Sequence, residues 1–172
     1  MDLNNRTIKA RIKVTPNTTA WLVTLRRYIF YAAALHLLWE FAHLPLYTIW
    51  QTGTTRELAF AAIHCTAGDI LIAMSTMLIS LFLIGDSAWP AQNSGAVLAV
   101  AIVLAVAYTI FSEWLNIVVR EAWAYRDIMP VVPIINTGLS PILQWIVVPS
   151  AAYALATRAG RRSPEFVGHE HG

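Results

Sequence analysis

Three long stretches of this 172-residue chain carry almost no formal charge. Between Tyr28 and Thr55 the only acidic or basic residue is Glu40, the stretch 58–112 holds only Asp69 and Asp86, and the stretch 128–157 holds none. Charged residues make up 13% of the chain, against about 25% in a typical soluble domain. Because so few charges cannot cover a water-exposed surface, the composition excludes a soluble globular protein and a disordered chain. The net charge of +2 is too small to indicate a nucleic-acid partner.

Four of the apolar segments are long enough to cross a lipid bilayer, which takes about 20 residues of helix. They are residues 28–49, 58–84, 95–119 and 139–157. Glycine and proline residues separate them, as in Gly85–Pro90 and at Gly138. The sequence therefore predicts an all-α fold: an integral membrane four-helix transmembrane bundle over residues 21–158, between a basic tail at 1–20 and a second tail at 159–172.

Lysine and arginine residues predict the orientation of the bundle, because they are enriched in cytoplasmic segments. Nine lie near the two termini: Arg6, Lys9, Arg11, Lys13, Arg26, Arg27, Arg158, Arg161 and Arg162. The opposite side has only Arg56, Arg120 and Arg126. We therefore expect both termini in the cytoplasm, and we expect the segment 121–136 to form a re-entrant or interfacial segment over the outer face.

Cys65 is the only cysteine. A single cysteine cannot form a disulfide within the chain, and it is too few for an iron–sulfur cluster or a thiolate zinc site. Its apolar surroundings in the sequence favour a small buried residue.

Polar side chains of all four predicted spans fall at similar depths. In the first span His36, Glu40 and His43 share one helical face, since they are four and three residues apart. At 1.5 Å of rise per residue, the depths below the outer edge are about 12 Å for Glu40, about 9 Å for His64 and Glu113, about 8 Å for Gln144 and about 16 Å for Asp69. The inner halves hold nothing more polar than serine or threonine. This coincidence predicts a polar pocket in the outer half of the bundle.

The same residues have a simpler interpretation, in which they only join the helices through hydrogen bonds. Such contacts usually use serine, threonine, asparagine or glutamine, whereas three carboxyl groups and three histidines need partners or neutralisation inside a membrane. We take Glu40, His43, His64 and Glu113 as candidate catalytic groups or metal ligands. The residues expected to orient them or to bind substrate are His36, Asp69, Asn116, Arg120 and Gln144.

Four chemistries are compatible with this set of residues. Glu40 and His43 form a Glu-x-x-His pair, which with His64 and Glu113 could hold one divalent transition metal. Without a metal, a Glu–His pair in a dry pocket can move protons on a lipid-soluble substrate. His43 and His64 could ligate a haem. Transport of a metal ion or proton would need polar groups in the inner halves as well, unless identical subunits assemble around an axis.

Two resemblances accompany these patterns. The spacing of His36 and Glu40 is similar to that in the first helix of sterol-isomerase-like four-helix membrane proteins, although the other acidic residues of that family have no counterpart here, so it implies architecture alone. The segments 39–47, 64–69, 112–116 and 138–145 resemble an uncharacterised family of small four-span bacterial inner-membrane proteins. That resemblance implies a multi-pass protein of the bacterial inner membrane and no activity.

The sequence thus leads to two main hypotheses, with a metal-ion or haem-binding transport or redox protein as a further alternative. The first is a membrane enzyme, metal-dependent or acid–base, that acts on a lipidic or small apolar substrate. The second is a non-catalytic membrane subunit or assembly factor whose polar residues are structural. The lipid bilayer is the one partner that both require.

Overall fold

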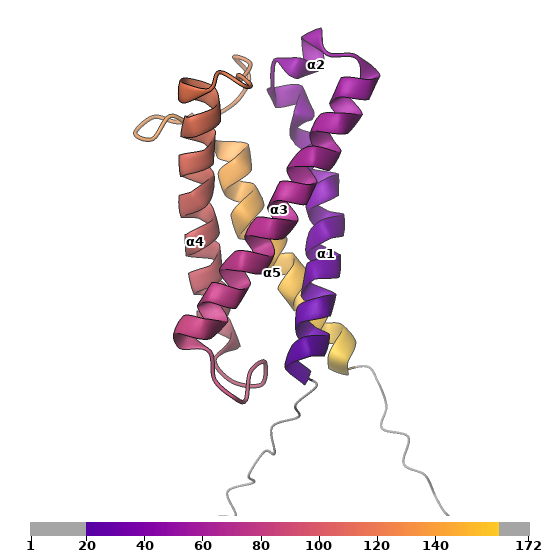
Figure 1. Ribbon diagram of the computed structural model, residues 1–172, viewed down its shortest axis with the longest axis vertical. Helices are drawn as coiled ribbons and strands as arrows, with labels where there is room; N and C mark the ends of the chain where they lie inside the picture. Colours follow the sequence, from indigo (N-terminus) through magenta and orange to yellow (C-terminus); the bar gives the residue numbers. More distant parts are fainter. Residues whose placement is uncertain (1–19, 162–172) are drawn as a thin grey trace, which may run out of the picture.

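The computed structural model describes residues 20–161 and is almost entirely helical (Figure 1). The predicted properties of the tails, at 1–19 and 162–172, lie outside the described residues. The elements in chain order are α1 (Ala20–His43), a 3₁₀ turn (Leu44–Leu46), α2 (Ile49–Thr52), α3 (Thr55–Ile84), α4 (Ser94–Trp114), a π-helical turn (Leu115–Val119), β1 (Val131–Val132), β2 (Thr137–Gly138) and α5 (Leu139–Arg161).

Four of these segments are long and apolar enough to cross a membrane: Ala20–Leu46, Thr55–Ile84, Ser94–Val119 and Leu139–Arg158. This confirms the predicted all-α architecture with four candidate spans. The first helix differs from the prediction, because it begins at Ala20 and ends at His43 instead of reaching Ile49. Pro45 explains the early end, since proline lacks the N–H that would continue an α-helix and its ring collides with the preceding turn.

The helices surround a common centre in the order α1, α3, α4, α5. Helix α1 packs against α3 and α5, and α4 packs against the same two helices. Helices α1 and α4 therefore lie diagonally across the bundle, with α3 crossing in front and α5 behind in the view of Figure 1. A side chain on any helix that points to the centre can face side chains from the others.

Small side chains at regular spacing let the helices approach one another. Helix α4 buries Val97, Ala101, Ala105, Thr109 and Glu113, one residue in every four. Helix α1 likewise buries a stripe from Thr24 through Tyr28 and Ala32 to His36 and Glu40. Apart from Thr24, apolar residues fill the half of both stripes nearer the connection between α3 and α4, and polar residues fill the other half. Large apolar side chains such as Phe82, which is 89% exposed, cover the outside, as a surrounding bilayer requires.

The polar half of the bundle ends in two connections that pack against each other. The chain between α1 and α2 forms an antiparallel bridge with the chain after α4, where Tyr47 pairs with Tyr125. The Thr48 N–H donates to the Ala124 carbonyl at 3.0 Å, and the Arg126 N–H donates to the Leu46 carbonyl at 2.9 Å. Residues 124–126 of the predicted interfacial segment therefore lie against the end of α1 and fix it relative to α4.

The orientation predicted from the basic residues places these connections outside the cell, and it can be tested by labelling. In a Cys65→Ser background, we expect a cysteine at Arg56, which is exposed beside the polar end, to react in intact cells with a membrane-impermeant maleimide. A cysteine at Ser87, which is exposed at the opposite end, should react only after the cells are opened. Labelling of Ser87→Cys, and not Arg56→Cys, in intact cells would show the reverse orientation.

Candidate functional site

One amide group joins three helices in the middle of the bundle. The Gln144 side chain of α5 donates through Nε2 to Glu40 Oε1 of α1 at 2.9 Å and to Asp69 Oδ2 of α3 at 3.0 Å. All three side chains are buried. A primary amide carries two N–H donors, so one nitrogen satisfies both carboxyl groups and holds them close together.

His36 completes this arrangement on the side of Asp69. Its Nδ1 lies 3.3 Å from Asp69 Oδ2 and 3.0 Å from Gln144 Nε2. Because both amide hydrogens already have acceptors, the network assigns the proton to His36 Nδ1, which donates to Asp69. The other ring nitrogen, Nε2, is buried without a partner. An unpaired acceptor is more readily tolerated in a protein interior than an unpaired N–H.

A second imidazole holds Glu40 from the opposite side. His43 Nε2 lies 3.1 Å from Glu40 Oε2, and His43 Nδ1 lies 3.1 Å from Ser140 Oγ. Trp39 Nε1, which can only donate, donates to the same Ser140 oxygen at 3.3 Å. The Ser140 hydroxyl is therefore free to donate to His43 Nδ1, and the Nε2 proton of His43 then faces Glu40. A continuous chain of donors runs from Trp39 to the carboxyl group.

The wall across from Glu40 is built around Glu113 of α4. Glu113 is 8% exposed, and its carboxyl group accepts a hydrogen bond from the Tyr125 hydroxyl. That hydroxyl in turn accepts from the Gly138 N–H at 2.9 Å, so the segment after α4 folds back to hold Glu113. Trp123 lies near Glu113. Its indole N–H is buried and has no hydrogen-bond acceptor among the described residues.

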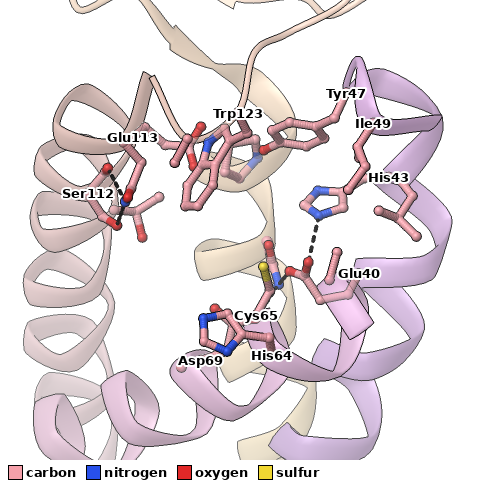
Figure 2. A pocket seen from close by; sticks show the side chains of 18 of the residues that line it. Glu40, His43, Tyr47, Ile49, His64, Cys65, Asp69, Ser112, Glu113 and Trp123 are labelled. Atoms are coloured by element: carbon pink, nitrogen blue, oxygen red, sulfur yellow. Dashed lines mark hydrogen bonds and ion pairs between the residues drawn. The ribbon is translucent and has the colours of Figure 1, made fainter. Parts of the chain in front are cut away.

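These two walls enclose a cavity of about 810 Å³. Figure 2 shows Glu40 and His43 on one side and Glu113 on the other, with Trp123 and Tyr47 between them. Asp69 and Gln144 also line the cavity. Its volume falls within the range of about 300–1,000 Å³ that is typical of small-molecule sites. The bundle therefore contains a space large enough for a ligand, with titratable groups in its walls.

The negative charge of Glu113 affects the two tyrosines of this end. Burial, and after it the neighbouring Glu113 charge, raises the pKa of Tyr47 well above its ordinary value. The same two causes raise the pKa of Tyr125. Both phenols are therefore held in the protonated form, in which Tyr125 can donate to Glu113.

The structure brings together some of the predicted site residues and separates others. Glu40, His43, His36, Asp69 and Gln144 form one network, and Glu113 faces them across the cavity. His64 lies outside this network: it is exposed and its ring stacks on Phe60 at 5.5 Å, although it lines the cavity. Asn116 and Arg120 bind each other along the π-helical turn, with Arg120 Nη1 donating to Asn116 Oδ1 at 3.2 Å.

The predicted metal and haem ligands do not converge. Among the residues that the structure describes, no three histidine, cysteine, aspartate or glutamate side chains lie where they could hold a metal ion together. His43 has both ring nitrogens bonded within the protein, and the His64 ring stacks on Phe60. The arrangement therefore supports neither the metal site nor the haem site.

Sequence reasoning missed the residues that position the charged groups. Ser140 and Trp39 orient His43, and the aromatic residues Tyr125, Trp123 and Tyr47 lie near Glu113 at the polar end of the bundle. Ser140 could have been suspected from its place one helical turn before Gln144. The contact of Tyr125 with Glu113 depends on the path of an irregular segment, for which the sequence carries no periodic signal.

No protein family, functionally described protein or solved structure matches the chain. The function therefore has to be inferred from the chemistry of the site.

The Gln144 amide should contribute measurably to the stability of the bundle. We expect Gln144→Leu to lower the free energy of unfolding by roughly 1–3 kcal/mol, because two buried carboxyl groups lose their shared donor. Unfolding would be followed by circular dichroism in detergent micelles titrated with dodecyl sulfate. Gln92→Leu, at an exposed position between α3 and α4, is the matched control and should change stability by less than about 0.5 kcal/mol. Equal costs for the two variants would contradict the bridging role.

Proposed function

We propose that this chain is a membrane-embedded enzyme that transfers protons on carbon atoms of a small, largely apolar ligand. The observation that carries the proposal is the Glu40 carboxyl group, which lies in the wall of the cavity and is held by His43 on one side and by Gln144 on the other. A carboxyl group fixed at both oxygens is oriented before the ligand arrives, which is what general acid–base catalysis needs.

Charge balance supports proton transfer at this position. The linked groups Glu40, Asp69, His36 and His43 contain two carboxyls and two imidazoles, and no lysine or arginine forms an ion pair with them among the described residues. With one ring proton on each imidazole, two adjacent carboxyl groups are stable in the low dielectric of a bilayer only if they hold a further proton between them. Protons that are shared within a hydrogen-bonded network can also be passed to a ligand.

Covalent catalysis is less well supported by the geometry. A hydrolytic triad has a nucleophile, a base and an acid that orients the base, joined in that order. The hydrogen bonds join Ser140, His43 and Glu40 in the same order. Ser140 is not among the side chains that line the cavity, and its hydroxyl accepts from Trp39. We therefore assign Ser140 to the positioning of His43.

The proposed reaction is balanced without an oxidant or reductant. Glu40 takes a proton from one carbon of the ligand, the electrons of that C–H bond form a new double bond as an existing one shifts, and a proton returns to another carbon. Asp69 and Gln144 hold Glu40 in place, and the Glu113 wall binds the rest of the ligand.

A structural role is the competing candidate, and one specific observation favours it: the single side chain of Gln144 in α5 forms hydrogen bonds to both α1 and α3. This role accounts for the hydrogen bonds between the helices. It does not explain why the carboxyl groups border a cavity of ligand size instead of a closely packed core.

Deuterium uptake tests the proposal without knowledge of the substrate. The purified protein in nanodiscs is incubated in deuterated buffer with a lipid extract of the cells that express it, and the extract is then analysed by mass spectrometry. We expect at least one lipid species to gain carbon-bound deuterium with the wild type, and the gain to fall about 100-fold or more with Glu40→Gln, since general acid–base groups typically contribute 10²–10⁴-fold.

Glu121→Gln is the control for this experiment, because Glu121 is exposed and lies outside the cavity lining. It should exchange deuterium as the wild type does. If the folded wild type and Glu40→Gln leave every lipid species equally labelled, the enzymatic proposal is wrong and the structural role is favoured.

A further inference from the structure

Glu113 is a buried carboxyl group without a cationic partner. It makes no ion pair among the residues whose side chains the structure describes. Neither of the two arginines that follow it in the chain contacts it: Arg120 lines the same cavity but donates to Asn116 Oδ1, and Arg126 donates to the Pro45 carbonyl. Glu40 and Asp69 each face an imidazole, whereas Glu113 has the neutral hydroxyl of Tyr125 as its hydrogen-bond partner. Within a membrane this leaves the Glu113 wall short of positive charge.

Aromatic rings surround the cavity next to this carboxyl group. Tyr47 and Trp123 line it, and Figure 2 shows both between Glu113 and His43. Tyr47 packs against the ring of Tyr125 with centroids 5.4 Å apart. Aromatic faces attract cations, and a desolvated ammonium group gains most from them. One unpaired carboxyl group beside several aromatic rings is the chemistry that recognises an ammonium group.

The other walls of the cavity suit an apolar body. Phe60 of α3 and Tyr108 of α4 line it, and they are also 68% and 49% exposed on the surface that faces the bilayer. Ile72 and Trp145 line it deeper in the bundle. Side chains that belong both to the cavity wall and to the lipid-facing surface mark a route by which a molecule dissolved in the membrane can reach the polar groups.

We propose that the Glu113 wall, made of Glu113, Tyr47 and Trp123, binds the positively charged head of a membrane-dissolved amine, whose apolar part extends between α3 and α4. This inference rests on the proposed function in that it names the ligand class of the same cavity. It places the charged head opposite Glu40, so that the carboxyl group that transfers protons faces the body of the ligand.

Three probes with one alkyl chain can test the charge preference. Radiolabelled dodecyltrimethylammonium, its uncharged carbon isostere 2,2-dimethyltetradecane and 1-dodecanol are equilibrated with the full-length protein in nanodiscs of zwitterionic lipid, and the uptake of empty nanodiscs is subtracted. We expect the ammonium probe to bind about tenfold or more tightly than either neutral probe. Equal binding of the three, or tighter binding of the alcohol, would overturn the proposal.

Variants of the wall locate the preference. Glu113→Gln should lower binding of the ammonium probe about tenfold and leave the hydrocarbon probe unchanged, and Tyr47→Leu should lower it several-fold through loss of one aromatic face. Glu121→Gln should match the wild type. Tyr47→Leu keeps the test decisive if Glu113→Gln fails to fold, as judged by gel filtration. A preference for the ammonium probe that survives in every folded wall variant would contradict the assignment.

The outcome is separable from that of the proposed function, because binding requires no turnover. Ammonium selectivity without deuterium exchange would overturn the enzyme and keep the ligand class. Deuterium exchange without ammonium selectivity would overturn the ligand class alone.

Discussion

The polar half of this bundle depends on one hydrogen-bonding group, the side-chain amide of Gln144. Two carboxyl groups from different helices would repel each other in a bilayer unless a donor lay between them. The amide supplies both donors from a single nitrogen and carries no charge that would itself need a partner. Glu40 and Asp69 can therefore lie side by side. His43 contacts the other oxygen of Glu40, and His36 contacts the same Asp69 oxygen as the amide. The order His43, Glu40, Gln144, Asp69, His36 is a consequence of that one bridge.

The two halves of the bundle satisfy different requirements. In the apolar half, alanines such as Ala73, Ala101 and Ala152 are buried at the contacts between helices, so the backbones come close and no cavity of comparable polarity forms. In the polar half, hydrogen bonds hold the helices at a distance that leaves about 810 Å³ of space. The packed half closes the cavity at its base, which suits a binding or catalytic site better than a pathway through the membrane.

Periodicity predicted the parts of this structure that are helical. The spans followed from length and apolar composition, and the stripe of His36, Glu40 and His43 followed from a repeat of 3.6 residues. The position of His64 outside the hydrogen-bonded network has a physical cause: depth places a residue along a helix but not around it. Five residues separate His64 from Asp69, a rotation of about 140° at 100° per residue, so the two lie on different faces of α3 and only Asp69 reaches Gln144. The contacts of Glu113 could not be predicted from periodicity. Tyr125 lies in an irregular segment whose position is fixed by pairing with the end of α1.

The central claim is that one amide nitrogen contacts both carboxyl groups inside the membrane. Solid-state nuclear magnetic resonance of the protein in lipid can measure this directly, with the Gln144 side chain observed through ¹⁵N and the carboxyl carbons of glutamate and aspartate through ¹³C. The account predicts that Gln144 Nε2 is dipolar-coupled at short range to two carboxyl carbons, one lost in Glu40→Gln and the other in Asp69→Asn. Coupling to one carboxyl carbon only, or to none, would contradict it.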